Sequence, residues 1–114
     1  MGFPISGELL DACVLGALSS EPAYGYELGQ KFGLALGLSE TALYPVLRRL
    51  MKDGQLSTYD EPFDGRNRRY YKITDHGANT LARHRDEWRS YRAGVNAFLG
   101  NDNISDNKIT GGRS

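Results

Sequence analysis

Apolar residues recur every three to four positions through the first half of the chain, and this spacing predicts three helices. The expected ranges are 6–18, 23–34 and 39–53. Their apolar stripes are Leu10, Cys13, Val14, Ala17 and Leu18 in the first, Tyr24, Leu28 and Phe32 in the second, and Leu43, Val46, Leu47 and Leu50 in the third. We expect Ser6 to cap the first helix, Ser39 or Thr41 to cap the third, and Gly54 to follow the end of the third.

The hydrophobic period changes after Gln55, where two segments alternate as strands do. Residues 56–59 and 69–74 are the predicted strands, and residues 60–66 between them contain a proline and an Asp-Gly pair. The pattern predicts a hairpin over about residues 55–74 with a long, mobile tip. Tyr71 and Ile73 are expected to face inward and so hold the cations of the second strand on one side.

A long helix is predicted over residues 75–100. Its apolar and aromatic positions alternate in steps of three and four, which is the narrow seam by which two helices pair. The pattern therefore differs from the wider stripe of a helix that covers a globular core. The seam residues are Leu81, His84, Trp88, Tyr91, Val95 and Phe98. Residues 101–114 are polar and without a pattern, and they are expected to form a disordered tail.

Charge is unevenly distributed along this chain of 114 residues. The formal net charge is zero and the pI is about 6.7, so the total indicates no particular partner. Within residues 66–72, however, there are four cations and no acid, namely Arg66, Arg68, Arg69 and Lys72.

Cys13, as a single cysteine, excludes an internal disulfide and fits a cytoplasmic protein. No apolar run approaches the ~18 residues that span a membrane.

The order of the predicted elements indicates a fold. Three helices followed by a hairpin form a winged helix-turn-helix, a mostly α fold with a β-hairpin, in which the third helix enters the DNA major groove. The hairpin, or wing, then reaches the phosphate backbone, where cations supply affinity. The candidate DNA-binding residues are Thr41, Ala42, Tyr44, Pro45 and Arg48 on the helix, and Arg66, Arg68, Arg69 and Lys72 on the wing.

Three segments carry a resemblance to a known family. "YGYEL" at 24–28, "LSETALYPVLRRLMKDG" at 38–54 and "GRNRRYYKIT" at 65–74 together resemble the PadR-like transcriptional regulators, in the smaller class with a single C-terminal helix. The resemblance implies a homodimeric repressor that binds a palindromic operator in double-stranded DNA, with the seam of the long last helix as the dimer interface. It further implies that Thr41, Tyr44, Pro45 and Arg48 face the groove, and that Arg66, Arg68 and Arg69 hold the backbone.

The resemblance also implies an effector. Family members that bind planar aromatic molecules often use a tryptophan of the last helix, and Trp88 matches that position, with Tyr91 beside it. Two departures stand out. Thr41 and Ala42 replace the family's frequent Gly-Thr, which puts the operator sequence in doubt, and Asn67 stands where a proline is frequent in the wing.

Each of these interpretations has a plainer alternative. The cations of the wing could be a solvated edge that pairs with nearby acids, and Trp88 could serve dimer packing alone. The whole domain could be a protein-interaction module. As an enzyme the chain lacks the usual nucleophile, phosphate-loop and metal-ligand motifs, and we expect no cofactor. His76 and His84 are eight residues apart, too far for a metal-binding pair on one helix turn.

Overall fold

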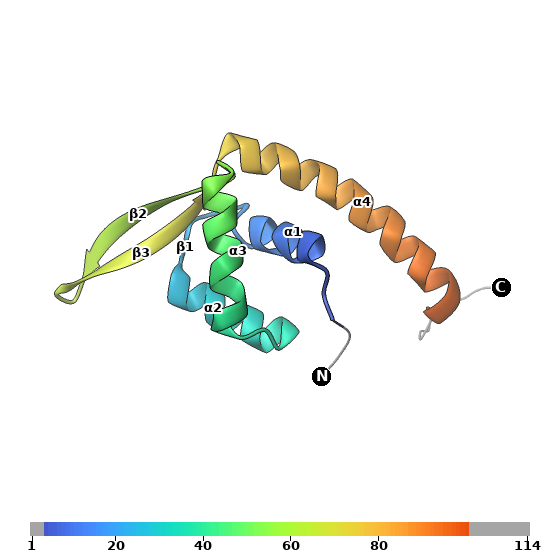
Figure 1. Cartoon of the computed structure of the whole chain (residues 1–114), viewed down its shortest axis with the longest axis horizontal. Coiled ribbons are helices and arrows are strands. Elements are labelled where there is room, and N and C mark those ends of the chain that lie inside the picture. The colour runs from blue at the N-terminus through green and yellow to red at the C-terminus, as the bar shows by residue number, and fades with distance from the viewer. Residues whose placement is uncertain (1–3, 101–114) are drawn as a thin grey trace. The chain divides into compact units, whose positions relative to one another are not determined.

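Three short helices and a small sheet precede one long helix. The computed structural model describes residues 4–100, and the predicted tail at 101–114 lies outside this range. The elements are α1 (Gly7–Ala17), β1 (Ala23–Tyr24), α2 (Gly25–Leu36), α3 (Glu40–Lys52), β2 (Leu56–Phe63), β3 (Arg66–Ile73) and α4 (Asp75–Leu99) (Figure 1). The chain divides into two units, Met1–His84 and Arg85–Ser114. The predicted winged helix-turn-helix, with its hairpin and long last helix, is confirmed.

The predicted helix ends are set by local hydrogen bonds. The side chain of Ser6 accepts from the backbone N–H of Leu9 at 3.1 Å, and that of Ser39 accepts from Ala42 at 3.2 Å. Gly54 follows α3 with a φ of 77°, a conformation that L side chains rarely adopt. The N–H of the next residue, Gln55, then returns to the carbonyl of Leu50 at 2.9 Å, which completes the cap.

The core of the first unit forms around one face of α3. The four stripe residues of that helix are each 8% exposed or less, and they pack with apolar side chains of α1, α2, β2 and the start of α4. Leu15 is fully buried although it is not part of the predicted stripe of α1, whereas Cys13 and Ala17, which are part of it, are only partly buried. Burial raises the pKa of the Cys13 thiol. The predicted stripe of α1 was therefore centred slightly off the buried face.

A two-residue strand, β1, was missed by the sequence pattern. Ala23 and Tyr24 pair antiparallel with Tyr71 and Tyr70, so the sheet has the order β1-β3-β2. These two residues were assigned to the second helix, which in fact begins at Gly25 and continues to Leu36. A strand of two residues is too short to have a period of its own, which explains the error.

The hairpin is longer and tighter than expected. β2 and β3 pair without interruption from Leu56 opposite Ile73 to Phe63 opposite Arg66. The turn consists of Asp64 and Gly65, both with positive φ (56° and 79°), as in a type I′ turn. The predicted long, mobile tip was therefore wrong. Pro62 suggested a loop, but β2 is an edge strand, where a proline is tolerated.

The start of α4 is joined closely to the base of the wing. The Thr74 hydroxyl donates to the carbonyl of Gly54 at 2.6 Å and accepts from the N–H of Gly77 at 3.1 Å, so one side chain caps α4 and ties it to the end of α3. Gly77 lies against the carbonyl of Gln55, and a Cβ at this position would collide with that oxygen. The joint leaves no room for any side chain at this glycine.

Gly77→Ala should therefore lower the free energy of unfolding by about 2 kcal/mol, because the new methyl group forces the wing base and α4 apart. Gly16→Ala is the matched control. Its Cβ would meet Leu81 at 3.9 Å, an ordinary contact, so the gain in helix propensity should leave the protein equally or more stable. Urea denaturation measures the free energy of unfolding of both variants. Equal values for the two would show that the space at Gly77 is not restricted by the Gln55 carbonyl.

Candidate nucleic-acid interface

The outward face of α3 is free. Thr41, Ala42, Pro45 and Arg48 are all exposed, on the side of the helix opposite the buried stripe. Pro45 lies inside the helix, where it has no N–H to donate, so the Thr41 carbonyl lacks its usual partner within the helix. Four of the five residues predicted for the groove thus share one accessible surface.

Tyr44, the fifth predicted groove residue, is partly buried and packs against the core. Burial is the main factor that raises the pKa of its hydroxyl, followed by the nearby carboxylate of Glu40. The hydroxyl therefore keeps its proton at neutral pH and can donate a hydrogen bond. The ring of Tyr44 lies between the core and the surface, so it can pack against the core and also contact DNA.

Arg49, the neighbour of Arg48, has a structural role. Its guanidinium forms two hydrogen bonds with the carboxylate of Asp11 on α1, at 2.7 and 2.9 Å. Hydrogen bonding to this carboxylate raises the pKa of Arg49. This bidentate geometry fixes α3 against α1. No pattern along the chain indicated this pair, because Asp11 lies 38 residues away from Arg49.

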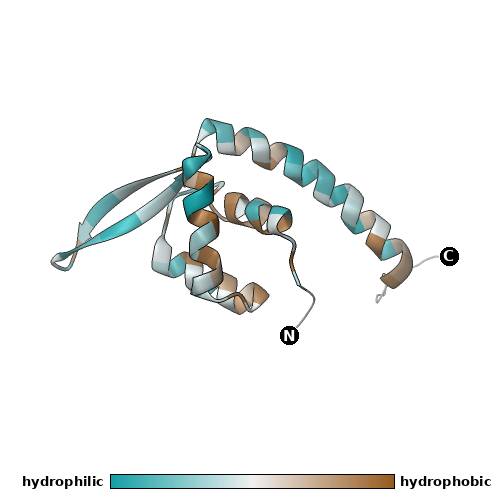
Figure 2. Ribbon diagram, viewed as in Figure 1, coloured by the Kyte–Doolittle hydropathy of each residue, from teal (hydrophilic) through white to brown (hydrophobic). Residues whose placement is uncertain are grey.

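The cations of the wing do not all point one way. Side chains alternate along a strand, and Tyr71 and Ile73 pack against the core. Arg69 belongs to that core-side set, whereas Arg66, Arg68 and Lys72 lie on the opposite, outer face. The expected single-sided strip is therefore wrong for Arg69. Figure 2 shows the hairpin as a largely hydrophilic projection from the helices.

The acids of the hairpin neutralise part of this strip. Arg69 forms an ion pair with Asp60 at 3.4 Å, as the plainer interpretation of the strip anticipated. Arg68 has Glu61 opposite it in the sheet, yet within residues 4–100 it forms no ion pair. Its guanidinium lies instead over two aromatic rings, those of Phe63 and Tyr24. The charge of Arg68 remains available.

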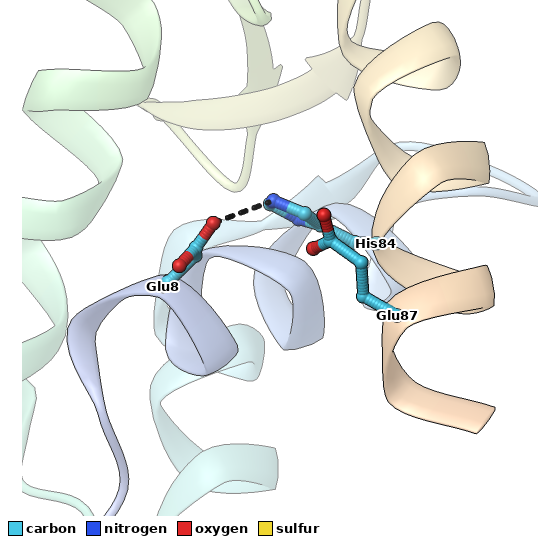
Figure 3. Close-up of side chains that lie close together, drawn as sticks. All are labelled: Glu8, His84 and Glu87. Atoms are coloured by element: carbon cyan, nitrogen blue, oxygen red, sulfur yellow. Dashed lines mark ion pairs between the residues drawn. The ribbon is translucent and has the colours of Figure 1, made fainter. Parts of the chain in front are cut away.

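The predicted seam of α4 divides into buried and exposed parts. Leu81 is 5% exposed and belongs to the core of the first unit. His84 is also largely covered, with its Nε2 atom 3.8 Å from a carboxylate oxygen of Glu8 on α1 (Figure 3). The remaining seam residues all have exposed side chains, and they are Trp88, Tyr91, Val95 and Phe98.

The exposed face of α3 and the cationic outer face of the wing define a winged helix-turn-helix protein of the DNA-binding class. Residues 14–83 match the model of the transcriptional regulator PadR-like family. The chain therefore belongs to this family, whose members are DNA-binding regulators of transcription. Nothing in the comparisons or in residues 4–100 points to catalysis. No helix in that range is long and apolar enough to cross a membrane.

Three relatives each match most of this chain. An uncharacterized protein of Lysinibacillus sphaericus is 30% identical over 95 residues, which cover 79% of this chain and 87% of that protein. A crystal structure of a Streptococcus mutans protein is 34% identical with a TM-score of 0.80, over 93% of this chain and all of that one. A PadR-like transcriptional regulator of Bacillus cereus is 32% identical with a TM-score of 0.73, over 82% and 94%.

The adjacent arginines of α3 form a matched pair for mutation. Arg48→Ala should weaken DNA binding and leave the unfolding transition unchanged, because Arg48 is exposed and has no acidic partner within residues 4–100. Arg49→Ala should instead lower the free energy of unfolding by about 1 kcal/mol, since it breaks a bidentate but half-exposed pair with Asp11. Thermal unfolding and a DNA-binding titration on both variants would separate the two roles, and a reversed result would refute them.

Proposed function

We propose that the protein is an effector-responsive repressor that binds a palindromic operator as a homodimer. The observation that carries the proposal is the free outward face of α3, with Arg48, accompanied by a wing whose outer face carries Arg66, Arg68 and Lys72. Cations on the wing neutralise phosphates and position the domain, while exposed side chains near the start of α3 meet base edges. Repression follows where the operator overlaps the binding site of the polymerase.

The second unit supports the homodimer. From Arg85 onward α4 exposes Trp88, Tyr91, Val95 and Phe98 at steps of three and four, and these large apolar side chains are costly to leave in water. In Figure 2 the hydrophobic colour gathers toward the C-terminal end of this helix. A second copy that packs along the same seam would cover them symmetrically. Two domains would then read two half-sites about 10 base pairs apart.

The effector would bind at the aromatic residues of this seam. The rings of Trp88 and Tyr91 lie 6.2 Å apart at an angle of 40°, which offers a surface for a planar aromatic molecule. Arg85 and Arg92 are on the same stretch of helix and would attract an acidic ligand. Because the same rings would contribute to the dimer, a ligand there would act on the spacing of the two DNA-binding domains.

A DNA-binding titration over a series of salt concentrations tests the repressor against the alternative of a protein-interaction module. If a dimer neutralises about eight phosphates, log K should fall with log salt at a slope of about −7. A palindromic duplex should also bind more tightly than a scrambled one of the same length. Binding that is absent, or insensitive to both salt and sequence, would favour the protein-interaction module.

The seam is tested by placing a charge on it. Val95→Glu should dissociate the dimer, because each chain would then bury a carboxylate in the apolar seam without a cation to pair with it. Ala93→Glu is the control, since the same charge then lies two residues away on the polar side of the helix. Sedimentation at low micromolar concentration measures the result. A Val95→Glu variant that stays dimeric would show that dimerisation uses another surface.

A further inference from the structure

A row of aromatic rings covers the outer face of the sheet. Tyr59 and Tyr70 lie opposite each other on β2 and β3, and their rings stack at 5.4 Å with an angle of 7°. Tyr24 on β1 follows at 5.8 Å from Tyr70. Phe63 lies at the end of β2 beside the turn, opposite Arg66, and is 53% exposed. No sequence motif or charge pattern singles out Phe63.

Arg68 fills the gap in this row. It lies on β3 between Arg66, the partner of Phe63, and Tyr70, the partner of Tyr24. The carbon atom of its guanidinium is 3.8 Å from the centre of the Phe63 ring and 4.6 Å from that of Tyr24. Both distances are well within the range of a cation–π contact. The guanidinium is therefore flanked by one ring toward the tip of the wing and another toward its base.

The two ring contacts use the charge of the guanidinium and leave its N–H donors without a hydrogen-bond partner. Arginine has five such donors, arranged in a planar fork that matches the oxygens of a phosphate. Within residues 4–100 the Arg68 side chain makes no hydrogen bond and no ion pair, although Glu61 lies opposite it in the sheet. The donors remain free for an oxygen outside the protein, while the two rings restrict where the group can lie.

We propose that Phe63 is a positioning residue for DNA binding: its ring, with that of Tyr24, holds Arg68 so that the guanidinium meets a backbone phosphate in one orientation. The proposal rests on the DNA-binding function proposed above. A long cationic side chain normally loses rotamer freedom when it binds, and this loss weakens binding. On this wing that loss occurs on folding, which makes Arg68 a stronger phosphate ligand than Arg66, which lies beside the turn and is more exposed.

A double-mutant cycle on operator affinity tests the proposal. Phe63→Leu keeps an apolar side chain but removes the ring, and it should weaken binding about five-fold for each wing that contacts DNA, the equivalent of one cation–π contact. Phe63→Tyr keeps the ring and should bind as the wild type does. In an Arg68→Ala background, Phe63→Leu should change little, because the group it positions is gone.

Other outcomes would overturn the proposal. An equal loss with and without Arg68 would mean that Phe63 contacts DNA itself or only stiffens the wing, and an unchanged affinity of Phe63→Leu would mean that the stacking has no effect on binding. Thermal unfolding of each variant confirms that the domain remains folded. Phe63 suits this purpose because it lies beside the turn, whereas Tyr24 belongs to the sheet next to the core.

A measurement on the free protein separates failure of this inference from failure of the proposed function. NMR relaxation of the arginine Nε–H groups should show Arg68 restricted in the wild type and released in Phe63→Leu, with Arg66 mobile in both as the internal reference. Equal mobility of Arg68 in the two proteins would refute the positioning role even if DNA binds. Absence of duplex binding by a wild type with a restricted Arg68 would refute the DNA-binding function instead.

Discussion

The structure depends on the burial of one face of α3. Leu43, Val46, Leu47 and Leu50 are almost completely removed from water, and each contributes about 1.5–3 kcal/mol by that burial. A helix fixed along one side must present its opposite side to solvent. The bidentate contact of Arg49 with α1 adds a second constraint on the same helix. The exposed face of α3 is therefore set by the core, and it can vary in sequence without loss of the fold.

The base of the wing is also held by burial in the core, whereas the rest of the hairpin is stabilised in another way. Near the core, Leu56, Tyr71 and Ile73 pack into the hydrophobic cluster. Beyond that point the hairpin has no core, and an isolated pair of strands is only marginally stable in water. The tight turn and the row of rings that holds Arg68 compensate for this. The aromatic residues of the outer face thus serve wing stability as well as the placement of charge.

The sequence predicted the helices and their caps well because these depend on local spacing. The buried stripe of α3 and the caps at Ser6 and Ser39 are where the periodicity indicated. Three of the misses involve partners distant in the chain. β1 forms only because it pairs with β3, and the contacts of Arg49 and Arg68 depend on residues of other elements. Alternation along β3 would have separated Arg69 from Arg68, and this signal was overlooked.

Selection of bound sites from random double-stranded DNA would show whether the exposed face of α3 recognises a DNA sequence. We expect two inverted half-sites about 10 base pairs apart, with base preferences that change when Thr41 or Arg48 is replaced and persist when Arg66 is replaced. Recovery of a single unpaired site would contradict the dimer. Recovery of no sequence preference at all would contradict the assignment of α3 as the element that reads DNA.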